Sequence, residues 1–202
     1  RELRRLELEA LKRMNIVGDT NQRQTSAVQF GMLSQVNVDQ MYGIEIEEFP
    51  ARVAELALWL TDHQMNMELS TEFGERFVRL PLHTHPNIRI TNALATDWNE
   101  VVPKERLSFI LGNPPFIGSK RQSESQRAEL AELFKGMDGS GVLDYVSGWY
   151  RKAAEYIQDT KIRVAFVSTN SITQGEQVGI LWKPLIEKYG IRIQFAHRTF
   201  KW

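Results

Sequence analysis

The sequence has no cysteine, no excess of charge of either sign and no long apolar run, and each absence excludes a class of function. Without cysteine there are no disulfides, thiolate metal ligands or cysteine nucleophile, and we expect the chain in the reducing cytoplasm. Lys and Arg number 25, as do Asp and Glu, so net charge gives no indication of nucleic-acid binding. No stretch approaches the roughly 18 consecutive apolar residues of a membrane span, and no signal-peptide pattern is present.

What is present is an alternation of strand and helix patterns across 202 residues, enough for one domain with a sizeable core. Short apolar segments typical of strands occur at residues 41–46, 88–90, 107–111, 163–168 and 191–196. Helical patterns occur at residues 1–14, 50–67, 123–134, 143–157 and 176–189. This alternation predicts an α/β fold with a doubly wound, mostly parallel sheet, formed by residues 1–202 as one domain.

The first two helices each have an apolar stripe that we expect to face the core, because helical spacing places such residues on one side. In the first helix the stripe consists of Leu3, Leu6, Leu8, Leu11 and Met14. In the second it consists of Val53, Leu56, Ala57 and Leu60. The chain begins at Arg1 inside the first helical pattern, so we expect a piece of a longer protein.

The segment from Asn113 to Phe116 is the clearest indication of chemistry. It follows the apolar residues 107–111, and its two prolines fix φ and remove two backbone donors, so the loop is stiff and rich in acceptors. An exocyclic amine bound there would donate to the Asn113 side-chain oxygen and to the Pro114 carbonyl, with its ring stacked on Phe116. The nitrogen lone pair would then point towards an electrophile on the opposite side.

Two acidic residues follow earlier strand patterns. In an open α/β sheet ligands bind beyond the carboxyl ends of the strands, and an acid at the end of the second strand suits ribose hydroxyls. Glu45 has that position, with Ile46 placed to lie against an adenine face; alternatively, Glu45 is a solvated charge near the start of the next helix. Asp97, before Trp98, follows another strand and is either an acceptor for an adenine amino group or a turn residue.

The order of these signals resembles the amino-methylating DNA methyltransferases that use S-adenosylmethionine. The likeness is closest to the N6-adenine enzymes of bacterial restriction-modification systems, including the type in which nuclease, methyltransferase and target-recognition parts are fused in one chain. The segments that carry it are Tyr42 to Arg52, Ile110 to Gly118 and Phe195 to Trp202. It covers most of the chain and implies a Rossmann-like fold, DNA as partner and a flipped adenine as target.

The resemblance also implies roles for individual residues. The cofactor-binding residues would be Glu45, Ile46, Asp97 and Trp98. The catalytic motif would be Asn113, Pro114, Pro115 and Phe116. Phe200 would flank the target base on the side opposite Phe116.

One departure from the family pattern concerns the glycine-rich loop that follows the first strand and wraps the methionine end of the cofactor. Neither Gly18 nor Gly31 lies in a strand-turn-helix context of that kind. We therefore expect an incomplete fold without the first strand, and a fragment that is inactive by itself.

Other readings remain open. Similar proline loops occur in methyltransferases that act on guanine amines of ribosomal RNA or on a protein glutamine amide, and a fragment with only a binding or scaffold role is a third reading. His83 and His85 alternate as neighbours on one face of a strand do and could form a metal pair, but no carboxylate or other third ligand is near in sequence, so we predict no metal site. Basic residues after the proline loop would touch phosphates or form a solvated helix face: Lys120, Arg121 and Arg127. Residues 168–171 would line the target pocket or only start the following helix.

Overall fold

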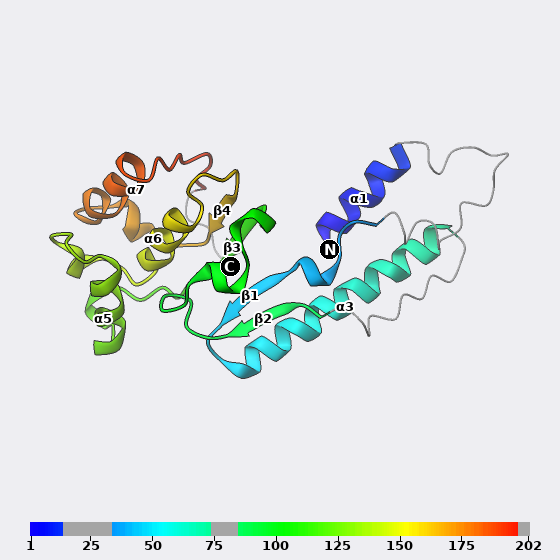
Figure 1. Ribbon diagram of the computed structural model, residues 1–202, viewed down its shortest axis with the longest axis horizontal. Helices are drawn as coiled ribbons and strands as arrows, with labels where there is room; N and C mark the ends of the chain where they lie inside the picture. The colour runs from blue at the N-terminus through cyan, green and yellow to red at the C-terminus, as the bar shows by residue number, and fades with distance from the viewer. Residues whose placement is uncertain (14–33, 74–84, 198–202) are drawn as a thin grey trace. The chain divides into compact units, whose positions relative to one another are not determined.

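The computed structural model describes residues 1–13, 34–73 and 85–197. The chain divides into two compact units, Arg1–Asn92 and Ala93–Trp202 (Figure 1). Each unit combines helices with one pair of parallel strands, so the predicted α/β class with parallel strands is confirmed. Within the described ranges, no helix combines the length and the apolar character needed to cross a membrane.

The first unit pairs two short parallel strands beside a long helix. Its elements are helix α1 (Glu2–Arg13), the 3-10 turn η1 (Val38–Gln40), strand β1 (Tyr42–Glu45), helix α3 (Glu48–Phe73) and strand β2 (Asn87–Ile90). Gly43 of β1 lies opposite Ile88 of β2. A Cβ at Gly43 would lie 2.7 Å from Cδ1 of Ile88, so any other residue there would require the end of the Ile88 side chain to shift.

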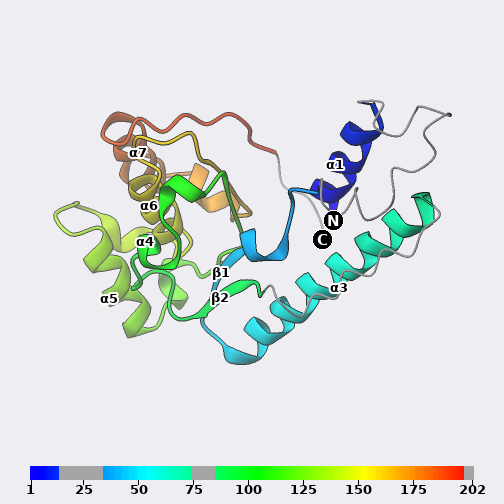
Figure 2. The ribbon, with the colours of Figure 1, turned by 45° about the vertical axis from the view of Figure 1, so that its right-hand side comes forward.

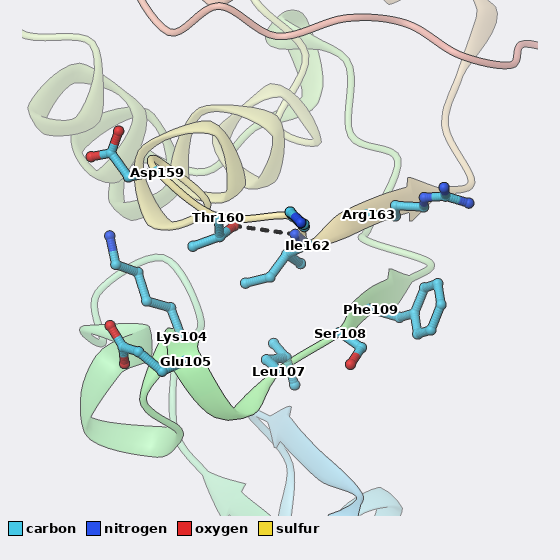
Figure 3. A pocket seen from close by; sticks show the side chains of 10 residues that line it. Lys104, Glu105, Leu107, Ser108, Phe109, Asp159, Thr160, Ile162 and Arg163 are labelled. Carbon is cyan, nitrogen blue, oxygen red and sulfur yellow. Dashed lines mark hydrogen bonds between the residues drawn. The ribbon is translucent and has the colours of Figure 1, made fainter.

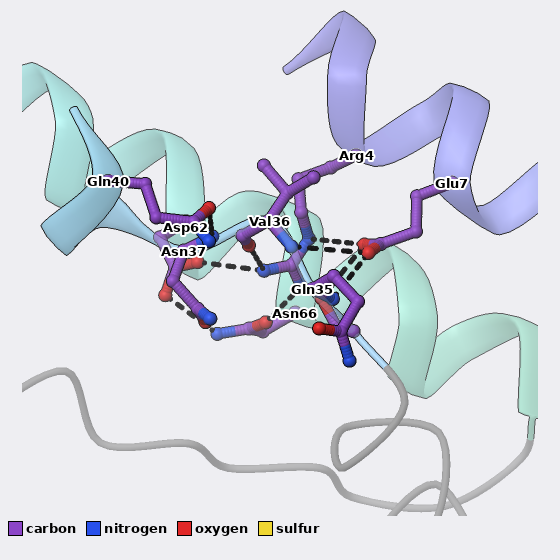
Figure 4. Close-up of polar contacts among 9 residues, drawn as sticks. Arg4, Glu7, Gln35, Val36, Asn37, Gln40, Asp62 and Asn66 are labelled. Atoms are coloured by element: carbon purple, nitrogen blue, oxygen red, sulfur yellow. Dashed lines mark hydrogen bonds and ion pairs between the residues drawn. The ribbon is translucent and has the colours of Figure 1, made fainter. Parts of the chain in front are cut away.

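Helix α1 is joined to α3 by a buried cluster of polar groups rather than by its leucines (Figure 4). Arg4 is only 6% exposed. Its Nη1 donates to Oδ1 of Asp62 (3.1 Å) and to the Val36 carbonyl (3.0 Å), and its Nη2 donates to Oδ1 of Asn66 (2.8 Å). One guanidinium therefore holds together three segments that are far apart in the sequence.

Glu7, one turn after Arg4, extends this cluster. Its Oε1 accepts the main-chain N–H groups of Gln35 (2.5 Å) and Val36 (3.2 Å). Leu3 and Leu6 are exposed instead, at 52% and 62%. The prediction of a helix at the start of the chain was right, but the prediction that these leucines face the core was wrong, because the helix turns its polar side towards α3.

Helix α3 also buries a different face from the predicted one. Its most buried residues are Ala51, Met65, Asn66 and Leu69. The stripe expected to face the core is exposed: Val53, Leu56, Ala57 and Leu60. The rotation of the helix follows from the hydrogen bonds of Asp62 and Asn66 with Arg4, which fix the side of α3 that faces inward.

The second unit contains the other strand pair and the remaining helices. The elements up to the second strand are helix α4 (Trp98–Val101), turn η2 (Lys104–Arg106), strand β3 (Phe109–Gly112), turn η3 (Ser119–Arg121), helix α5 (Glu124–Leu133), turn η4 (Ser140–Val142), helix α6 (Ser147–Tyr156) and strand β4 (Arg163–Phe166). After β4 come the 3-10 turn η5 (Asn170–Thr173), the π-helical turn η6 (Val178–Trp182) and helix α7 (Lys183–Glu187). β3 and β4 are parallel, with Gly112 opposite Phe166.

The core of the second unit lies among α5, α6, α7 and the segments between them. Its buried residues are Leu94, Leu130, Phe134, Leu143, Tyr145, Val146, Ala154, Ile172, Leu181 and Leu185. Tyr150 of α6 meets Phe166 of β4 edge to face, with ring centroids 5.3 Å apart. On β3, by contrast, Phe109 and Leu111 are 56% and 78% exposed. The strand pair is thus packed on one side only among the described residues.

Two expectations for the C-terminal region need correction. Residues 191–197 have no regular secondary structure, so the strand predicted at residues 191–196 is wrong. The alternation of Ile191, Ile193 and Phe195 suits a strand, but strand formation depends on a pairing neighbour, and none of the described strands pairs with this segment. The single helix predicted at residues 176–189 is divided into η6 and α7.

Removing the Arg4 side chain should destabilise the first unit strongly. In Arg4→Leu the carboxylate of Asp62 would stay buried without its cation, which costs about 3 to 5 kcal/mol of unfolding free energy. Chemical denaturation measures this difference. The matched control is Arg13→Leu, which breaks the exposed pair with Glu9 and should cost less than about 0.5 kcal/mol. Equal losses in the two variants would show that the cluster does not hold the unit together.

Candidate active site

The loop Asn113–Phe116 leaves the carboxyl end of β3. Pro114 is buried and anchors the loop, whereas Asn113, Pro115 and Phe116 are exposed. Gly112 allows a tight exit from the strand, because a Cβ there would lie 3.1 Å from the Phe166 ring. Neither the Asn113 side chain nor the Pro114 carbonyl receives a hydrogen bond from another described residue. The two acceptors expected to grip an amine are therefore available.

The far end of this loop is held by two donors. The main-chain N–H of Tyr145 donates to the Ile117 carbonyl (2.9 Å), and Nε2 of Gln122 donates to the same oxygen (3.3 Å). Gln122, 5% exposed, also donates to the Leu143 carbonyl (2.9 Å). These contacts complement the rigidity of the prolines. No sequence pattern indicates Gln122, because its hydrogen bonds to Ile117 and Leu143 form only in the folded chain.

Asp97 begins helix α4 and is exposed. Its Oδ1 accepts the main-chain N–H of Asn99 (2.9 Å) and the Asn99 side-chain amide (3.3 Å), which makes it the N-cap of this short helix. Oδ1 of Asp97 therefore has the local structural role expected of a turn residue. No described residue donates to Oδ2, so that oxygen is available to a ligand.

Trp98 supports the Asp97 segment from within the unit. Only 8% of the residue is exposed, and its indole N–H donates to the Ala93 carbonyl (2.9 Å). Its ring meets Tyr156 of α6 edge to face at 5.7 Å, and the Tyr156 hydroxyl donates to the Val102 carbonyl (2.6 Å). Figure 2 shows α4 and α6 side by side, as these contacts require. Little of the indole is left for contact with a ligand.

Lys152 of α6 fixes the segment that leads to Asp97. Its ammonium donates to the carbonyls of Leu94 (3.2 Å) and Thr96 (2.5 Å). Burial lowers the pKa of Lys152, and the carboxylates of Asp97 and Glu155 oppose that shift. The sequence gives no local sign of this residue, because its partners lie more than 50 positions away.

Glu45 ends β1 in the first unit and is half-buried. Its Oε1 accepts the main-chain N–H groups of Ile46 (2.9 Å) and Glu47 (3.2 Å), which orient the carboxylate beyond the strand. Oε2 receives no hydrogen bond from a described residue. Ile46 beside it is 61% exposed, so an apolar surface adjoins the free oxygen.

The expected site residues are distributed over both units. Glu45 and Ile46 belong to the first unit, and Asp97, Trp98 and the segment 113–116 to the second. Phe200 and His83 lie outside the described residues. Across residues 1–13, 34–73 and 85–197, no group of three His, Cys, Asp or Glu side chains is arranged to hold a metal ion.

A hollow of about 650 Å³ lies at the opposite end of the β3–β4 pair (Figure 3). Its walls come from the segments before β3 and before β4: residues 104–105, 107–109 and 159–163. Because the Asn113–Phe116 loop leaves the carboxyl end of β3, this hollow at the amino ends is not the place where that loop acts.

Comparison with known proteins assigns the chain to a family. The model of the MmeI DNA-methyltransferase domain matches residues 1–202. DNA methyltransferase A of Bacillus subtilis (strain 168) is 43% identical over 207 residues, which is 100% of this chain and 22% of that protein. The solved structure of the Type IIL restriction-modification enzyme MmeI in complex with DNA is 52% identical, with a TM-score of 0.90 over 100% of this chain and 26% of that one.

The chain thus spans about a quarter or less of the length of these relatives. The match nevertheless includes both strand pairs, the Asn113–Phe116 loop and the acids at Glu45 and Asp97, since it runs over every residue. The chain therefore belongs to the family of MmeI DNA-methyltransferase domains.

Proposed function

We propose that this chain binds the nucleoside end of S-adenosylmethionine and holds the N6 amine of a flipped adenine in DNA for methyl transfer. The observation that carries the proposal is the loop after β3, which presents Asn113 and Phe116 on the surface and has two acceptor oxygens to which no described residue donates. Family membership supports DNA as the substrate over the ribosomal RNA and protein glutamine alternatives.

The chain's acids fit the nucleoside part of such a cofactor. Glu45 and Asp97 each have one carboxylate oxygen held by a main-chain N–H and a second oxygen that receives no hydrogen bond from a described residue. Fixed carboxylates of this kind suit the hydroxyls of a ribose and the amino group of an adenine. Exposed Ile46 would lie against the ring, and Trp98 would contribute by supporting Asp97 rather than by broad contact.

The target amine would be held by two neutral acceptors. Asn113 Oδ1 and the Pro114 carbonyl would each accept one of its N–H groups, which directs the nitrogen lone pair away from the loop and stabilises the charge that develops on nitrogen. The bound cofactor would supply a methyl group already activated by a sulfonium. No side chain of this chain then needs to act as a general acid or base, and catalysis is a matter of placement.

Phe116 would offset the energy of base flipping. Extracting a base from a duplex costs a few kcal/mol, and stacking on an aromatic ring returns about 1 to 3 kcal/mol. Phe116 is 40% exposed, so its ring is accessible. Phe200 would cover the other face of the base.

The proposed fold is Rossmann-like, with a doubly wound, mostly parallel sheet. A first strand and its glycine-rich loop, which these 202 residues do not contain in a recognisable form, would bind the methionine end of the cofactor. The polypeptide 1–202 would accordingly be inactive alone. In the full-length protein it would act together with target-recognition and nuclease regions, for which relatives about four times as long leave room.

Replacement of Asn113 tests the amine grip. In the full-length protein, Asn113→Ala should lower the rate of methyl transfer to DNA on the order of 100-fold, by analogy with the loss of one preorganised polar group. S-adenosylmethionine affinity, measured by calorimetry, should stay unchanged. Asn87→Ala, which alters an exposed asparagine of the first unit, serves as the control. An unchanged rate in Asn113→Ala would eliminate this mechanism.

Replacement of Asp97 separates its two possible roles. Serine also caps helices well, so Asp97→Ser retains the N-cap and loses only the free carboxylate oxygen. Loss of a charge-assisted hydrogen bond of about 1.5 kcal/mol should weaken S-adenosylmethionine binding about tenfold. Calorimetry of the full-length protein measures this change. Wild-type affinity in Asp97→Ser would mean that the residue serves only as a cap.

A further inference from the structure

The second unit contains a buried carboxylate that accepts hydrogen bonds from one loop at the carboxyl end of its strand pair and lies near the other. Asp144 precedes α6 and is only 6% exposed. Its Oδ2 accepts hydrogen bonds from the hydroxyls of Thr169 (3.0 Å) and Ser171. These two hydroxyls also contact each other at 2.7 Å. The loop that follows β4 is therefore tied to Asp144 by two side chains.

The other oxygen of Asp144 faces the loop that follows β3. A Cβ at Gly118 would lie 3.5 Å from Asp144 Oδ1, so the space that a side chain at this position would enter adjoins the carboxylate. The next residue, Tyr145, donates its main-chain N–H to the Ile117 carbonyl (2.9 Å). Asp144 and Tyr145 together thus contact the end of the Asn113–Phe116 loop and the loop after β4.

Asp144 is itself held in place from a third segment. Its main-chain N–H donates to Oε1 of Gln177 (2.9 Å), and its carbonyl accepts the Ser147 hydroxyl at the start of α6. No Lys or Arg among the described residues pairs with the carboxylate. Burial of a carboxylate without a cation has a high desolvation free energy. An apolar contact would hold the loops at a lower cost in free energy. This favours a role in positioning over one in stability.

We propose that Asp144 is a positioning residue that sets the Thr169–Ser171 segment against the Asn113–Phe116 loop, so that both form walls of the pocket for the target base. β3 and β4 are adjacent and parallel, with Gly112 opposite Phe166, so their loops leave the same edge of the sheet. Strand pairing fixes only the roots of the loops, about 4.8 Å apart. The Asp144 carboxylate would fix the two loops at a point further from the strands. This inference rests on the proposed function and adds a residue that contacts neither base nor cofactor.

The test uses single-turnover methylation of DNA by the full-length protein. Asp144→Asn and the isosteric Thr169→Val should each slow methyl transfer about 10- to 100-fold, the range in which small misplacements of a reacting group act. S-adenosylmethionine affinity should stay within about twofold of wild type, because the cofactor acids are on other segments. Thr169→Ser, which keeps the hydroxyl, should restore the rate.

The double variant distinguishes positioning from general damage. If both residues act through one contact, Asp144→Asn with Thr169→Val should be no slower than the slower single variant, whereas independent effects would multiply. Ser123→Ala removes the N-cap of α5 and is the control for stability, since it should lower the melting temperature without changing the rate. If Asp144→Asn does not fold, Thr169→Val alone still tests the contact.

Two results would overturn the inference: a wild-type rate in Thr169→Val, or multiplied losses in the double variant. Failure of the proposed function would be recognised separately, because the wild-type protein would then methylate no adenine or Asn113→Ala would be fully active. Suppose that the wild-type enzyme is active, Asn113→Ala is inactive and Thr169→Val is unaffected. The proposed function would then be supported, and the positioning role of Asp144 would be refuted.

Discussion

The parallel pairing of β3 with β4 is the constraint on which the candidate site depends. Parallel strands end at the same edge of a sheet, so the loop with Asn113 and the loop with Thr169 must emerge next to each other. The pairing ends at Gly112 and Phe166, and beyond that point no ladder holds the backbone. Beyond it, the two prolines and the hydrogen bonds of Gln122 and Asp144 constrain the loops.

Buried polar side chains also hold segments together elsewhere in the molecule. Arg4 joins α1, α3 and the segment before β1, and Lys152 fixes the carbonyls that precede Asp97. Each of these groups bridges segments that are distant in the sequence and donates hydrogen bonds to at least two of their oxygens, in keeping with the rule that buried polar groups are hydrogen-bonded. Leucines expected to face the core, by contrast, are exposed on both helices: Leu3 and Leu6 of α1, and Leu56 and Leu60 of α3. Orientation of helices in the first unit therefore follows polar contacts first.

Local patterns were sufficient to predict the strand that ends at Glu45, the strand that precedes Asn113 and the long helix α3, but not the short helix α4. Turn chemistry also made the Asn113–Phe116 loop recognisable, because two prolines constrain the backbone wherever they occur. Patterns failed where the answer depended on a neighbour. The exposed Leu56 and Leu60 read as core residues, and residues 191–196 read as a strand, since periodicity does not say what lies opposite. No sequence pattern indicated Lys152 or Gln122, because their roles come from contacts made only in the folded chain.

The central claim is that the loop after β3 presents an adenine amine for methylation. The most direct measurement is mass spectrometry of nucleosides from plasmid DNA after incubation with the full-length protein and S-adenosylmethionine. The account predicts N6-methyladenine as the modified nucleoside. Methylated cytosine in its place, or unmodified DNA together with a methylated ribosomal RNA or protein glutamine, would contradict it.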